Sequence, residues 1–185
     1  LHLRALAIQE QSLGAHHSEL VALLDELAYS YGHNYPLAEP LLKRVLALRE
    51  KEFGVNSLPV AKWLNYMAGL CYKQGRYAQA LPLYTRALRI AEKVEDPSHL
   101  DSLLGLASVY SAQEQYALAE PLYQRALKIE EKALGPNHVL LAVTLEKLAL
   151  LYHAQKRYAV AWPLLQRALA IRKRDLDSPP DKKQF

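Results

Sequence analysis

The sequence predicts an all-α protein in which about four and a half helical hairpins stack into an α-α superhelix, that is, a solenoid. Ala and Leu abound and β-branched residues are sparse, with only 7 Gly among 185 residues, a composition that favours helix over sheet. A tyrosine-centred motif recurs four times at a nearly constant interval. A second helical pattern precedes each copy, and self-similarity of this period is typical of stacked helical repeats.

The repeated motif predicts the second helix of each hairpin. Its copies are YPLAEPLLKRVLAL, YAQALPLYTRALRI, YALAEPLYQRALKI and YAVAWPLLQRALAI, and their first tyrosines are 42, 39 and 42 residues apart. Alanine follows three positions after the tyrosine, leucine six, arginine nine and leucine eleven. The tyrosines are Tyr35, Tyr77, Tyr116 and Tyr158, and the arginines are Arg44, Arg86, Arg125 and Arg167.

The segment before each tyrosine predicts the first helix. These segments are LLDELAYSY, WLNYMAGLC, LLGLASVY and TLEKLALLY, and each carries an apolar residue followed by alanine. The small alanine allows a neighbouring helix to approach closely. Short turns such as KQGR join the two helices, and longer turns join the hairpins, where Asn56, Ser98 and Asn137 are available as helix caps.

One hairpin cannot bury its apolar side alone, so the hairpins are expected to stack into one array over residues 1–176. Residues 1–14 match a second helix, so the chain is expected to begin inside a helix, as a fragment of a longer array or without its upstream part. The full repeats are expected at 15–54, 55–96, 97–135 and 136–176, and the tail at 177–185.

Each second helix carries a proline five residues after its tyrosine, namely Pro40, Pro82, Pro121 and Pro163. An interior proline costs about 3 kcal/mol, so four of them must lie where little is lost. The helix is therefore expected to begin near the tyrosine, either with regular hydrogen bonding from about Leu118 in the third copy or with a bent first turn.

Several classes of protein are excluded. The net charge of +4 forms no basic stripe, which argues against nucleic acid, and no apolar run is long enough to span a membrane. Cys71 is the single cysteine and occupies a core position, so no internal disulfide is possible, and we expect a cytoplasmic protein. No phosphate loop, nucleophile elbow or metal-binding motif occurs, so neither an enzyme nor a cofactor or metal site is expected.

The succession apolar-Ala-x-x-Tyr, Tyr-x-x-Ala and Ala-Leu resembles tetratricopeptide (TPR) repeats. The wording YALAEPLYQRALKIEEKALGPNH is similar to the longer repeat variant of kinesin light chains and of many scaffold proteins. The resemblance implies a concave groove, lined by the first helices, that holds a peptide of a protein partner. The Leu-Asn-Asn-Leu-Ala motif of kinesin light chains survives only at Leu64-Asn65.

Within that groove, Asn65 can both donate and accept hydrogen bonds, Lys62 and Lys73 suit an acidic side chain, and Tyr29 and Tyr72 offer flat contact. A solvated surface position is the alternative for each polar residue. The implied partner-binding residues are Asp25, Tyr29, Lys62, Asn65, Tyr72, Lys73, Asp101, Ser108, Glu146 and His153.

The four motif tyrosines are interpreted as packing residues at the turn, because they repeat with the period of the fold. The arginine row is interpreted as a solvated or inter-repeat charge row with Glu39, Glu120 and Glu131 in reach, with a binding stripe as the alternative. The leading hypothesis is a non-catalytic scaffold for protein–protein interaction that binds a partner's peptide. Two alternatives stay open: self-association through the terminal repeats or a tail in the groove, and a regulatory arm of a larger protein.

Overall fold

The computed structural model describes residues 6, 8, 11–12, 14, 19–31, 35–94, 96 and 99–177. These residues form helices and turns without any strand, so the all-α prediction is confirmed. Of residues 1–14, where a half repeat was expected, most lie outside the described part, as does the tail from 178 onward. The helices are α2 (Leu20–Ser30), α3 (Tyr35–Phe53), α4 (Leu58–Lys73), α5 (Tyr77–Lys93), α6 (His99–Ala112), α7 (Tyr116–Leu134), α8 (Leu140–Ala154) and α9 (Tyr158–Asp177).

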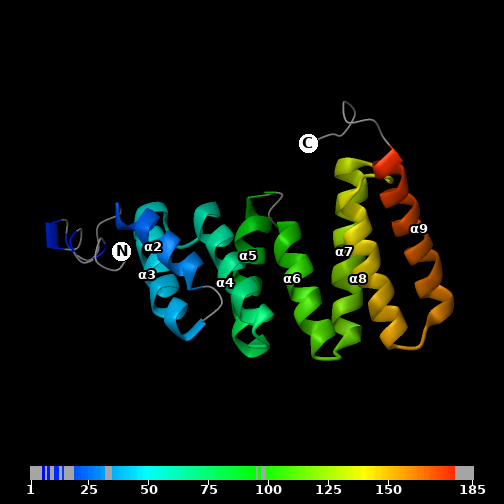
Figure 1. Ribbon diagram of the computed structural model, residues 1–185, viewed down its shortest axis with the longest axis horizontal. Coiled ribbons are helices and arrows are strands. Elements are labelled where there is room, and N and C mark those ends of the chain that lie inside the picture. Colours follow the sequence, from blue (N-terminus) through cyan, green and yellow to red (C-terminus); the bar gives the residue numbers. More distant parts are fainter. Residues whose placement is uncertain are drawn as a thin grey trace. The chain divides into compact units, whose positions relative to one another are not determined.

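The chain forms two compact units, Leu1–Ser102 and Leu103–Phe185, and the boundary between them falls inside α6. In the first unit α2 packs on α3, α3 on α4 and α4 on α5. In the second unit α7 packs on α8 and α8 on α9, in the order of the sequence (Figure 1). The predicted fold of stacked helical hairpins is confirmed within each unit.

The alanines of the repeat let the helices approach closely. In the first unit Val60, Ala61 and Leu64 of α4 are fully buried in one cluster with Ala87 and Ile90 of α5. The core of the second unit follows the same plan, with every alanine at most 3% exposed; its members are Ala107, Ala119, Tyr123, Leu141, Ala142, Leu145, Leu148, Ala149, Leu151, Tyr152, Ala161, Ala168 and Ile171. Cys71 is a fully buried free thiol, so its assignment to the core is confirmed.

The prolines stand near the start of each second helix, as predicted. All four second helices begin at the motif tyrosine, and in α7 the backbone N–H groups of Leu118 and Ala119 donate to the Gln115 carbonyl at 3.0 and 3.2 Å. Pro121 is the sixth residue of α7, so one bond, to the Ala117 carbonyl, is lost. Both residues are exposed, so water can reach that carbonyl in place of the missing N–H.

The predicted asparagine caps are wrong. Ser57 precedes α4 and Val139 precedes α8, so Asn56 and Asn137 lie one and two residues too early, and Ser98 is outside the described part. The hydroxyl of Ser57 makes no cap hydrogen bond, and Pro59, the second residue of α4, lacks an N–H. At α8 the imidazole Nδ1 of His138 accepts a hydrogen bond of 3.3 Å from the Leu140 N–H.

The arginine row joins one repeat to the next. Arg86 of α5 pairs with Glu50 of α3 at 2.6 Å and donates to the Val55 carbonyl at 2.8 Å. Arg167 of α9 repeats this geometry with Glu131 of α7 at 2.6 Å and the Pro136 carbonyl at 2.8 Å. The inter-repeat interpretation therefore holds for these two arginines, and each also fixes the turn between hairpins.

Two of the motif tyrosines, Tyr77 and Tyr158, contact a ring at the end of the first helix across the turn. The rings of Tyr77 and Tyr72 are 5.7 Å apart, and Tyr158 meets His153 edge-on at 5.2 Å. Tyr116 is partly buried against the core of the second unit, whereas Tyr158 remains 55% exposed. The packing role is confirmed for Tyr77 and Tyr116, whereas Tyr158 makes one ring contact and stays mostly exposed. The side chain of Tyr35 lies outside the described part.

In the last three hairpins the short turn has a left-handed residue two positions before the tyrosine. Gly75, Glu114 and Lys156 occupy that position with φ of 71°, 59° and 61°. A side chain in this conformation costs about 1–2 kcal/mol, and glycine avoids the cost.

We therefore expect Gly75→Ala to destabilise the protein by about 1 kcal/mol and Lys156→Gly to stabilise it slightly. The midpoint of urea unfolding followed by circular dichroism measures both. The neighbouring Gln155 has φ of −79°, so Gln155→Gly is the control and should destabilise. A lower midpoint for Lys156→Gly would contradict the strain argument.

Candidate partner-binding surface

In the first unit an aromatic cluster joins the first helices α2 and α4. The rings of Tyr29 and Tyr66 have their centres 4.6 Å apart, and Tyr66 lies 5.1 Å from Trp63. Tyr29 is 61% exposed, so the cluster presents a flat ring to solvent. Burial raises the pKa of Tyr66 to about 12, with Tyr29 and Asp25 adding to the effect, so this phenol stays neutral.

Asp25, a predicted site residue on the same helix as Tyr29, is already paired. Its Oδ2 accepts a hydrogen bond of 2.7 Å from Nη2 of Arg49, whose guanidinium carbon lies 4.8 Å from the centre of the Trp63 ring. Burial raises the pKa of Asp25, and the charge of Arg49 opposes that shift. The Trp63 indole N–H donates to the Leu42 carbonyl at 3.0 Å, which holds α4 against α3. Because Arg49 already binds its carboxylate, Asp25 is a structural residue of this surface more than a group that can bind a partner.

Lys62, Asn65 and Asp101 are the polar residues of the middle of this unit. Lys62 and Asp101 are exposed, and partial desolvation raises the pKa of Asp101 while the Lys62 ammonium opposes that rise. Asn65 accepts a hydrogen bond of 2.8 Å through Oδ1 from the buried Ser102 hydroxyl. Its amide Nδ2 is buried and has no hydrogen-bond partner in the described part of the chain. An unsatisfied amide donor is thus placed beside two opposite charges.

Tyr72 and Lys73 close the end of α4. Tyr72 is partly buried against Tyr77, and burial raises the pKa of its phenol. Lys73 is exposed. Seven of the ten predicted residues thus lie in the first unit, on α2, α4 and the first turn of α6.

The other three predicted residues lie in the second unit, where Ser108 and Glu146 are already hydrogen-bonded within the protein. The Ser108 side chain is 6% exposed and shares a hydrogen bond of 3.0 Å with the Tyr123 hydroxyl. Glu146 accepts a hydrogen bond of 2.7 Å from Arg172, and His153 is exposed beside Tyr158. Ser108 is therefore a connecting residue and offers little surface to a ligand.

The sequence reasoning missed two residues that connect successive first helices. Tyr66 lies two positions before Ala68, the repeated alanine of its helix, and it contacts Tyr29, which directly follows the equivalent Ala28. Lys147 stands two positions before Ala149 and donates a hydrogen bond of 3.1 Å to Ser108, the residue after Ala107. These pairs occupy the same repeat positions, so the register of the repeat was the signal that would have found them.

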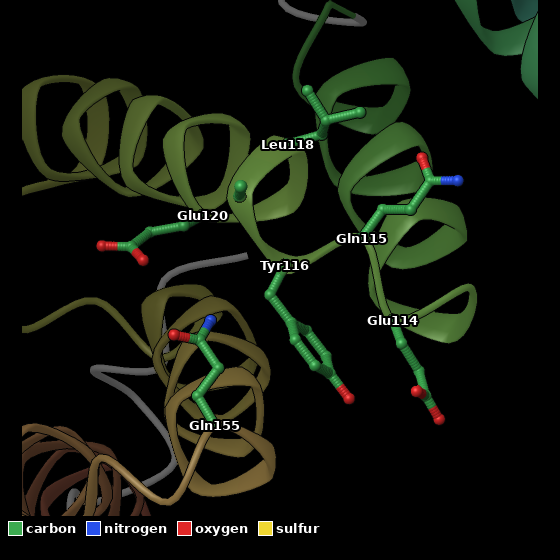
Figure 2. Close-up of a pocket in the computed structure, with 7 residues that line it drawn as sticks. Glu114, Gln115, Tyr116, Leu118, Glu120 and Gln155 are labelled. Carbon is green, nitrogen blue, oxygen red and sulfur yellow. The ribbon is translucent and has the colours of Figure 1, made fainter.

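A shallow depression lies at the turns of the second unit, away from the predicted residues. Its volume is about 590 Å³, and Figure 2 shows Tyr116 between Glu114 and Gln155 along its wall. Glu120 at its edge is fully occupied, because Tyr152 donates to its Oε1 at 2.9 Å and Arg157 to its Oε2 at 2.8 Å. The carboxylate of Glu120 is therefore held by the protein's own side chains.

Within the described ranges, no group of three or more metal-ligating side chains lies close enough to hold an ion. None of the helices in the same ranges is long and apolar enough to cross a membrane.

The repeated pattern of helices, turns and buried alanines agrees with the comparison to known families. The family model for the tetratricopeptide repeat matches residues 20–93 and 98–174. The chain belongs to the tetratricopeptide repeat family. Repeats of this family are generally scaffolds for protein–protein interaction and are typically non-catalytic, and tetratricopeptide proteins bind protein partners.

The repeats are similar in structure to those of kinesin-light-chain type. A candidate kinesin light chain of Podosopora anserina with nearly identical TPR-like repeats is 26% identical, with a TM-score of 0.81 over 96% of this chain and 86% of that one. BtubC (BKLC) of P. vanneervenii is 19% identical, with a TM-score of 0.80 over 100% and 75%. The apo form of RapI is 20% identical, with a TM-score of 0.79 over 95% and 64%. The last two share the fold alone. No curated protein matches the sequence.

The residue fourteen positions after the motif tyrosine differs in charge from one hairpin to the next. Arg49 and Arg172 hold it in the first and last tetratricopeptide hairpins and pair with Asp25 and Glu146 at 2.7 Å. In α7 the same position is Glu130, which is 4% exposed and whose Oε2 has no hydrogen-bond partner among the described residues. Burial raises the pKa of Glu130, the nearby Thr144 hydroxyl opposes the rise, and the charge of Glu131 adds to it.

We expect Glu130→Gln to raise the stability at pH 7 by on the order of 1 kcal/mol, because it removes a buried carboxylate without a cation. A raised pKa means that the native state holds the proton more tightly. Below the ordinary pKa of 4.5 the Glu130 carboxyl is protonated in both the native and the unfolded state, so burying it carries no charge penalty. As the pH rises, the carboxyl must lose its proton in a buried position, and the wild-type protein becomes less stable. The gain should therefore disappear near pH 4.

Urea unfolding of both proteins at pH 7 and pH 4 measures this difference. Glu131→Gln is the matched control, because Glu131 pairs with Arg167 at 2.6 Å and its loss should destabilise slightly. An equal gain for Glu130→Gln at both pH values would show that the charge is not responsible.

Proposed function

We propose that this tetratricopeptide protein is a non-catalytic interaction module that binds a peptide segment of a partner protein along the exposed face of its first helices. The observation that carries the proposal is the middle of the first unit. There the exposed Lys62 and Asp101 present opposite charges beside Asn65, whose amide is held by the buried Ser102 hydroxyl. A peptide can offer an acidic side chain to the Lys62 ammonium and hydrogen-bond donors to the Asp101 carboxylate.

The contacts around Asn65 support a prepared site. The hydrogen bond from Ser102 fixes the carbonyl side of the Asn65 amide, so its orientation is set before a ligand arrives. Tyr29 adds an exposed ring that is held by Tyr66 and so loses little entropy on binding. Lys62 and Lys73 are exposed cations on the same helix, α4, and suit an acidic side chain of the partner.

We expect Lys62→Glu to weaken partner binding several-fold or more without lowering the melting temperature, because Lys62 is exposed on α4. Asn65→Ala should also weaken binding, but with some loss of stability, because it removes the acceptor of the buried Ser102 hydroxyl. Affinity capture with the immobilised chain and mass spectrometry identifies the partner, and calorimetry with the purified partner gives the dissociation constants. Lys93→Glu on the second helix α5 is the matched charge reversal and should leave binding unchanged. Full binding by both site variants would refute the groove assignment.

One observation favours a second candidate, self-association. An apolar stripe runs along α9, formed by Trp162, Leu165, Leu169 and Leu176 at exposures of 63%, 36%, 68% and 76%. The counterpart of Leu165 in α3 is Leu42, which is fully buried and whose carbonyl accepts the Trp63 indole N–H of α4. The same face that α4 covers on α3 is thus exposed on α9, and a second copy could cover it.

Self-association through α9 predicts a molar mass that rises with concentration and falls back to the monomer value in Leu169→Glu. Multi-angle light scattering over a wide concentration range measures the mass. Leu118→Glu on α7, at a residue that is 51% exposed, is the control and should leave the mass as in the wild type. A strict monomer at high concentration would exclude this candidate.

A further inference from the structure

The exposed face of α8 carries an apolar stripe that the second unit does not cover. Leu140, Val143 and Leu150 are 54%, 44% and 63% exposed. Together with Lys147 they follow one another at intervals of three and four residues, so all four lie on one side of the helix. Single exposed apolar residues are ordinary, but a row of them along one helix face is typical of a surface that another segment covers.

Lys147 stands in the middle of this stripe without a counter-ion. It is partly buried, and its single hydrogen bond in the described part of the chain goes to the Ser108 hydroxyl at 3.1 Å. The adjacent Glu146 is not available to it, because Arg172 already holds that carboxylate at 2.7 Å. Burial lowers the pKa of Lys147, and no neighbouring carboxylate counteracts the shift.

The position of the ammonium is held from behind. Ser108 is 6% exposed and shares a hydrogen bond of 3.0 Å with Tyr123, so α6 and α7 fix the hydroxyl to which Lys147 donates. One of the three ammonium protons is used in this way, which leaves donors for an incoming acceptor. The tyrosine, the serine and the lysine thus form a chain of hydrogen bonds that ends on the open face of α8.

We propose that the α8 face binds an amphipathic helical segment of a partner protein that carries one Asp or Glu in the middle of its apolar side. The acid would pair with Lys147, and apolar side chains three or four residues before and after it would cover Leu140, Val143 and Leu150. This inference rests on the proposed function and adds to it the class of ligand that the second unit takes.

Charge and shape together select this occupant. A wholly apolar helix would bury Lys147 without a partner, which is strongly unfavourable. A strongly acidic, extended segment would leave the leucines and the valine exposed. An amphipathic helix matches the stripe in geometry, because its own apolar residues recur at the same intervals of three and four.

A displayed library of 16-residue helix-forming peptides, selected on the immobilised full chain, tests the inference. We expect the enriched peptides to share one acid flanked by apolar residues at three or four positions on either side. A synthetic copy of the best peptide should bind at least tenfold more weakly to Lys147→Met by fluorescence anisotropy. Lys147→Glu should lose it, and should regain binding to a peptide with Lys in place of the acid.

Lys128→Met on the exposed face of α7 is the matched control and should bind like the wild type. Lys147→Met removes an unpaired, partly buried charge, so it should fold at least as well, and its circular dichroism and melting temperature verify this. Enriched peptides without an acid, peptides rich in proline, unchanged binding by Lys147→Met, or no enrichment at all would overturn the inference. Peptides whose binding depends on Lys62 and not on Lys147 would also overturn this inference, but they would support the proposed function.

Discussion

Every other feature of this protein depends on the close approach of helices at the alanine positions. A helical hairpin of this kind has one apolar side that it cannot bury against itself, so its stability comes from the next hairpin. The alanines leave room for the neighbouring backbone, and the leucines beside them fill the remaining space. In the described hairpins Ala28, Ala68, Ala107 and Ala149 are all fully buried. A larger residue there would separate the helices and disturb the contacts on both sides.

This spacing also fixes which side chains meet across successive hairpins. Once the alanines are in register, the residue two positions before one alanine contacts the residue just after the previous one. That rule brings Tyr66 to Tyr29 and Lys147 to Ser108, although the chemistry differs completely between the two pairs. Similarly, the arginines of the second helices reach a glutamate and a turn carbonyl of the preceding repeat in both units. The repeat therefore determines which positions meet, whereas the residue types at those positions differ from one hairpin to the next.

The fold was predictable from the sequence because it depends on features that occur four times. The tyrosine starts, the prolines five residues later and the buried Cys71 all followed from comparing one copy with another. The caps were not, because Asn56 and Asn137 occur in turns of different sequence, where a proline or a histidine changes which groups are available. Side-chain pairing was also out of reach for Ser108, whose burial depends on Tyr123 and Lys147 at once.

Where the repeats differ in residue type, the fold does not require one particular side chain. The residue fourteen positions after the motif tyrosine is Arg49, Ala91, Glu130 and Arg172 in turn. Packing accepts all four, yet only the arginines find a carboxylate on their own first helix, at Asp25 and Glu146. Glu130 and Lys147 remain as opposite charges without an ion-pair partner in the described part of the second unit. Each of these charges is costly to desolvate. A ligand that pairs with Lys147 on the face of α8 would recover the part of that cost that this ammonium carries in the free protein.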